Sequence, residues 1–183
     1  MSCEWAHNAY PSSALYGTAR HHRRLPHLPW QPELLENPKT AALFAEDLTL
    51  HIPAGVDFIS ANENIHFSSV LAVHGGSETM HVDDTLMFVP TPKQAEIFSF
   101  REGTVQFHPT LFGALEPRRG AAEDFRVWAR RLGSEASFVN LCTAHLGTLL
   151  ERENTGDSMP RRIEAALAVV EPVLLGHELI YGR

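Results

Sequence analysis

Residues 64–88 (NIHFSSVLAVHGGSETMHVDDTLMF) have the pattern of two β-strands joined by a tight turn. Residues 68–74 (SSVLAVH) are β-branched and apolar, and residues 79–88 (TMHVDDTLMF) alternate weakly between apolar and polar. The linker at residues 75–78 (GGSE) offers glycines for the positive φ angles of a hairpin turn. This stretch therefore predicts a β-hairpin.

Two adjacent carboxylates, Asp83 and Asp84, interrupt the apolar run of the second predicted strand. Burial of unpaired carboxylates costs free energy, so a metal ion, a basic partner or an opening to solvent should compensate them. Because neighbours along a strand point to opposite faces, we expect Asp83 to point away from Asp84 and to cap a loop.

The remainder of the chain interleaves predicted helices and strands. The amphipathic pattern of residues 121–132 predicts a helix, and a longer final helix is expected over residues 161–175 with Ser158 as its N-cap. Helices are also expected at 2–9, 39–46 and from 147 onward, and strands at 48–52, 56–60, 95–100, 104–108 and 138–142. The pattern predicts one layered α+β domain.

Composition excludes several classes of function. The chain has 183 residues and a net charge of −7, which argues against a general nucleic-acid-binding protein. No apolar run approaches the ~18 residues of a membrane span, so we expect no membrane partner. The two cysteines, Cys3 and Cys142, do not form a disulfide framework and predict reduced thiols in a cytoplasmic protein.

Histidine is unusually frequent, with 11 residues, which directs attention to metal binding. His66 precedes one predicted strand, Asp84 lies in the next, and His145 follows the strand predicted at 138–142. Side chains at strand ends can converge on one edge of a sheet. Two imidazoles and a carboxylate suit zinc, with iron or manganese as alternatives, although spacing alone makes this triplet one of many.

Three segments also carry a resemblance to a known family. Residues 64–70 (NIHFSSV), 83–88 (DDTLMF) and 140–145 (NLCTAH) resemble the second half of the metallo-β-lactamase-fold hydrolases. The resemblance implies that His66 and His145 bind metal and that Asp84 bridges two ions or ligates one, which makes Asp84 the catalytic carboxylate. A metal-activated water would be the nucleophile.

Two departures from the family pattern accompany this resemblance. Asp83 stands where the family usually has glycine, and the first-half His-x-His-x-Asp-His motif is absent. The implied fold is therefore an αββα sandwich that is N-terminally incomplete, a single domain over residues 1–183 lacking the first strands and first metal motif. Such a truncated sandwich leaves an apolar sheet face uncovered and could self-associate as a homo-oligomer.

Three functional hypotheses follow. The first is a metal-dependent hydrolase acting on an unidentified small-molecule substrate. The alternative is a non-catalytic remnant of the same fold with weak or no metal binding, acting through self-association. The third is an unrelated β-rich binding module, which requires that His66, Asp84 and His145 lie far apart. The remaining histidines near these elements, His51, His108 and His177, are interpreted as structural.

Overall fold

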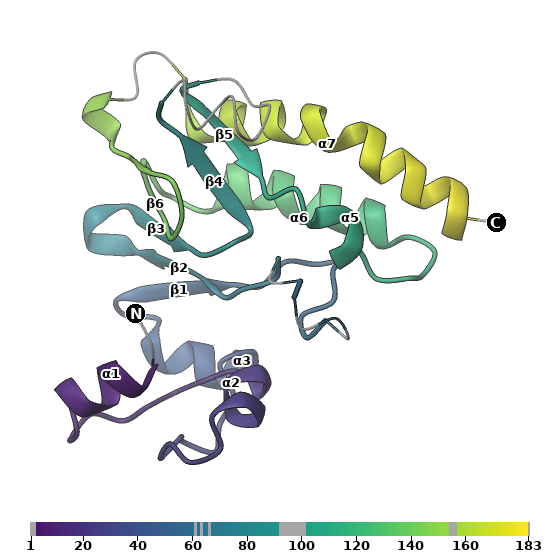
Figure 1. The fold of residues 1–183 in the computed structure, drawn as a ribbon. Helices are drawn as coiled ribbons and strands as arrows, with labels where there is room; N and C mark the ends of the chain where they lie inside the picture. The colour runs from purple at the N-terminus through teal and green to yellow at the C-terminus, as the bar shows by residue number, and fades with distance from the viewer. Residues whose placement is uncertain are drawn as a thin grey trace. The chain divides into compact units, whose positions relative to one another are not determined.

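The computed structural model describes residues 3–60, 62, 64–65, 67–91, 102–153 and 157–182. The chain divides into two compact units, Met1–Glu46 and Asp47–Arg183 (Figure 1). His66 and the strand predicted at 95–100 lie outside the described residues. The expectation of one metallo-β-lactamase-like domain over the whole chain stays a prediction.

The first unit is helical. It contains α1 (Cys3–Ala9), which agrees with the predicted helix at 2–9, α2 (Ala19–Arg24), and α3 (Pro38–Ala41) followed by the 3-10 turn η1 (Ala42–Phe44). Trp30 organises the connecting loop, because its ring stacks on His22 with centroids 5.4 Å apart and its Nε1 donates to the Leu25 carbonyl.

The second unit is built on a mixed five-stranded sheet in the order β1-β2-β3-β6-β7. These strands are β1 (Leu48–His51), β2 (Leu71–His74), β3 (Thr79–Val82), β6 (Asn140–Thr143) and β7 (Thr148–Leu149). The β3–β6 pair is parallel and the other pairs are antiparallel. A separate antiparallel pair joins β4 (Leu86–Val89) to β5 (Thr104–Phe107).

The predicted hairpin is present as β2 and β3, with two corrections. Its turn is the 3-10 turn η2 (Gly75–Ser77), and the residue with positive φ is Glu78 (φ 46°) rather than a glycine. The second strand stops at Val82, and Asp83 and Asp84 form the turn that carries the chain into β4 of the other sheet. Adjacent carboxylates are poor residues for a buried strand interior, so the break falls where they occur.

Two long helices cover the apolar side of these strands. They are α6 (Ala121–Glu135) and α7 (Met159–Tyr181), each longer than predicted, and the short α5 (Leu111–Ala114) follows β5. Figure 1 shows α6 and α7 running beside β4 and β5. The fully buried side chains are large and apolar, among them Phe67, Phe107, Phe125, Met80, Leu141 and Ile163. Burial of this area is the main source of stability.

Other predicted elements are corrected by the structure. Residues 56–60 do not form a strand, because only Val56 makes an isolated bridge, to Leu115. The helix predicted from residue 147 is replaced by β7 and the 3-10 turn η3 (Glu151–Glu153). The coarse α+β class is confirmed. Among the described helices, none combines the length and apolarity needed to cross a lipid bilayer.

The second face of the five-stranded sheet carries both apolar and polar side chains. Ala72, His81 and Cys142 are cross-strand neighbours on that face, and they are half-buried or exposed. Leu50 lies opposite Ala72 on the same face, so the surface is mixed, and the self-association expected of an uncovered sheet face stays a prediction.

Candidate metal centre

Strand pairing brings Asp84 and His145 to one edge of the sheet. β3 and β6 are parallel neighbours, with Val82 opposite Thr143, so the chain leaves both strands at the same end. The exit from β3 carries Asp83 and Asp84, and the exit from β6 carries His145. Parallel pairing therefore brings together two of the three residues that the strand-end argument predicts to converge, Asp84 and His145.

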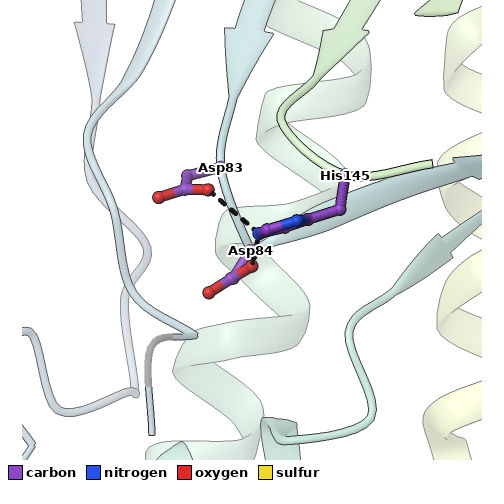
Figure 2. A group of neighbouring side chains, drawn as sticks. All are labelled: Asp83, Asp84 and His145. Atoms are coloured by element: carbon purple, nitrogen blue, oxygen red, sulfur yellow. Dashed lines mark ion pairs between the residues drawn. The ribbon is translucent and has the colours of Figure 1, made fainter. Parts of the chain in front are cut away.

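The three side chains form a compact cluster (Figure 2). His145 Nε2 lies 2.9 Å from Asp84 Oδ1 and 3.6 Å from Asp83 Oδ1. One ligand atom from each residue lies within 4.8 Å of the others. The Asp84 side chain is only 14% exposed, whereas those of Asp83 and His145 are 59% and 60% exposed. Asp84 thus forms the inner side of the cluster and the other two its rim.

The position of Asp83 differs from the expectation. It was predicted to point away from Asp84, but Figure 2 shows both carboxylates beside the His145 ring. The alternation rule fails here because Val82 is the last residue of β3 and the two aspartates lie in a turn.

The loop that carries His145 is held by local contacts. The Thr143 hydroxyl lies 2.5 Å from the His145 carbonyl and 2.7 Å from the Gly147 carbonyl. Leu146 adopts a positive φ of 70°, which is uncommon for a residue with a side chain. At Gly147 a Cβ would come within 2.6 Å of the Pro90 ring, so only glycine fits against the end of β4. These contacts hold the backbone of the loop at His145 and Gly147.

Thr85 anchors the turn that carries Asp83 and Asp84. Its buried hydroxyl donates to the Phe67 carbonyl at 2.8 Å. This bond links the residue after Asp84 to the residue that follows His66 in the sequence. His66 itself lies outside the described residues, so its assignment as a ligand stays a prediction.

His108 is a neighbour of the cluster that sequence reasoning treated as structural. It follows β5, and its backbone N–H donates to the Thr85 carbonyl at 3.3 Å. Burial lowers the pKa of His108, and the nearby charge of Asp84 opposes that shift. Thr110 holds the ring through Nδ1, with the hydroxyl at 2.8 Å and the backbone N–H at 3.3 Å. His108 comes close to Thr85 through the pairing of β4 with β5, and the sequence alone does not predict that register.

The donor set fits a divalent metal ion chemically. One imidazole nitrogen and two carboxylate oxygens suit zinc, iron and manganese. The same groups can also form a simple ion pair, in which a protonated His145 is satisfied by Asp84. The hypothesis of an unrelated binding module requires Asp84 and His145 to lie far apart. The structure places His145 Nε2 2.9 Å from Asp84 Oδ1, so this requirement is not met for these two residues.

Comparison with known proteins adds no relative. No protein-family profile, curated protein sequence or solved structure shows significant similarity to this chain.

Proposed function

We propose that this chain is a metal-dependent hydrolase domain of the metallo-β-lactamase type, with Asp84 and His145 among its metal ligands. The observation that supports it is the 2.9 Å approach of His145 Nε2 to Asp84 Oδ1 from two separate strand exits. Both residues stand where the resemblance of residues 83–88 and 140–145 assigns ligands. Zinc is the expected ion, and iron or manganese would suit the same donors.

Asp84 and His145 have complementary properties. Asp84 is largely shielded from water, so its carboxylate gains from a cation more than an exposed group would. His145 is mostly exposed, which leaves one side of the cluster open to solvent and to a substrate. When bound, a divalent ion there would act as a Lewis acid and lower the pKa of water toward neutrality.

A hollow next to the cluster offers space for a small molecule. It has a volume of about 310 Å³, and its lining includes Val70, His81, Asp83 and Thr143. This size is at the low end for ligand pockets, so a small substrate fits best. Asp83, at the boundary between hollow and cluster, is placed to accept a proton or a hydrogen bond from a molecule bound there.

Metal content of the purified chain tests this proposal. After dialysis against metal-free buffer, elemental analysis should show about one equivalent or more of zinc, iron or manganese. Asp84→Asn and His145→Ala should each lose most of it, whereas His27→Ala should keep it, because His27 belongs to the first unit and its side chain is 60% exposed, as is that of His145. Hydrolysis of chromogenic ester, thioester and phosphodiester substrates by the loaded protein should then depend on Asp84. Absence of retained metal, or equal loss in all three variants, would contradict the assignment.

The second candidate is the non-catalytic remnant of the same fold. It is favoured by the 2.9 Å contact between His145 Nε2 and Asp84 Oδ1, because a ring N–H that donates to the carboxylate satisfies both groups without a metal ion. Retained metal without any hydrolysis, or no metal at all in a folded chain, would select this candidate.

A further inference from the structure

The solvent-facing side of α7 carries no charge over most of its length. Every exposed residue between Ala165 and Ile180 is uncharged. This outer face consists of Ala165, Ala168, Val169, Pro172, Leu175, Leu179 and Ile180. The glutamates of the same segment, Glu171 and Glu178, bond to Arg126 of α6 instead. A surface helix normally shows polar side chains to water, so this face is built for contact.

The spacing of the outer face is that of a helix-pairing seam. Intervals of three and four residues alternate along Ala165, Ala168, Pro172, Leu175 and Leu179. This is the repeat by which one helix packs against another. The inner face of α7 is separate and already occupied, because Ile163, Leu167, Val170 and Leu174 lie buried in the core.

We propose that the occupant is the α7 helix of a second copy of this chain, crossing antiparallel around Pro172. The N-terminal half of the seam is small, with Ala165 and Ala168, and the C-terminal half is large, with Leu175 and Leu179. An antiparallel crossing sets the small half of one helix against the large half of the other. A parallel pair would stack alanine on alanine and leave gaps, which lose contact energy.

Charge and area support a weak two-fold dimer. A chain of net charge −7 repels its own copies, and an uncharged face is where two copies approach at the least electrostatic cost. The four large side chains Val169, Leu175, Leu179 and Ile180 are 50–74% exposed. Pairing would bury roughly 1,000 Å² in total, at the low end of specific interfaces. A dissociation constant on the order of 10–100 µM is therefore expected.

Sedimentation velocity of the full chain, from about 5 to 500 µM, tests the dimer. A monomer–dimer equilibrium is expected, and Leu179→Glu should raise its dissociation constant roughly tenfold or more. Leu43→Glu is the matched control, because Leu43 is 64% exposed in the first unit and outside the seam. A monomer throughout, or a dimer that Leu179→Glu leaves intact, overturns the proposal. A monomer that cosediments with phospholipid vesicles also overturns it and identifies a membrane surface as the occupant.

Disulfide cross-linking tests the antiparallel arrangement. With Cys3 and Cys142 replaced by serine, a mixture of Ala165→Cys and Leu179→Cys chains should give the mixed dimer as the main oxidised product, because both positions lie seven residues from Pro172. Predominant Leu179–Leu179 cross-linking would overturn the antiparallel crossing. Neither readout requires metal or activity, so the result is independent of the proposed hydrolase function.

Discussion

The hydroxyl of Thr85 donates to the backbone carbonyl of Phe67 at 2.8 Å, and both residues are fully buried. Thr85 directly follows Asp84, and Phe67 directly follows His66. The bond therefore fastens the turn between β3 and β4 to the segment that holds the other expected ligand. A site assembled from loops needs such fixed points, because ligand geometry depends on groups that hold the ligands in place.

Thr85→Val is expected to destabilise the protein by about 1–3 kcal/mol, because the buried Phe67 carbonyl loses its donor. Urea denaturation measures this cost, and Thr148→Val at an exposed strand position should change stability by less than about 0.5 kcal/mol. Metal affinity should also fall in Thr85→Val, through the displaced turn. Equal stability of the two variants would show that the bond contributes little.

Replacement of the cluster residues should give a graded loss of metal binding. Asp84→Asn and His145→Ala should abolish stoichiometric zinc binding in calorimetric titrations while leaving the far-ultraviolet circular dichroism unchanged. Asp83→Asn should weaken binding less, because its carboxylate is 59% exposed and 3.6 Å from His145 Nε2. His66→Ala should match Asp84→Asn if the resemblance assigns it correctly. A larger effect at Asp83 than at Asp84 would reverse the assignment of inner and rim ligands.

His51 should make stability depend on pH. Burial lowers the pKa of His51, and Glu135 opposes the shift. Below about pH 6.5 the unfolded chain binds a proton that the native protein binds less well, so the free energy of unfolding should decrease as the pH falls. The variant His51→Leu should show a shallower decrease between pH 7 and 5 in urea denaturation. A slope identical to that of the wild type would exclude His51 as the source.

Arg126 should be the most important ion-pairing residue between α6 and α7. Its side chain is 8% exposed and contacts Glu123, Glu171 and Glu178. The variant Arg126→Leu leaves these partly exposed carboxylates without a cation, and we expect a loss of about 1–3 kcal/mol. Arg131→Leu breaks only the exposed pair with Glu135 and should cost less than about 1 kcal/mol. Thermal unfolding measures the loss of stability in both variants. Equal losses would show that burial of Arg126 does not strengthen its ion pairs.

Local sequence patterns predicted the elements whose signals are short-range. The hairpin at residues 68–88 needs only two apolar runs and a turn, and α6 needs only a helical period and suitable ends. The patterns failed where the secondary structure of a segment depends on pairing with a segment distant in the sequence. Residues 56–60 have strand character, but no neighbouring strand pairs with them beyond the bridge of Val56 to Leu115. Residues 148–149 became a strand because β6 offers an edge for pairing.

In the candidate site, too, some features follow from local sequence and others depend on the tertiary structure. Asp84 and His145 were identifiable as candidate ligands because their residue types and flanking segments resemble a known family. The inclusion of Asp83 was not predictable, since it depends on the end of β3 at Val82. His108 was missed because its proximity comes from the register of β4 and β5.

The amino-acid sequence by itself determined the α+β class, the hairpin, the amphipathic helices and the residue types available for metal binding. These follow from periodicity, turn chemistry and donor chemistry, all of which act over a few residues. Only the tertiary structure decided that β6 lies parallel to β3, and hence that His145 reaches Asp84. The spacing of Ile163, Leu167, Val170 and Leu174, by contrast, already predicts the buried side of α7, and the structure confirms it. Strand order and helix orientation depend on burying one continuous core, a property of the whole chain that no single segment contains.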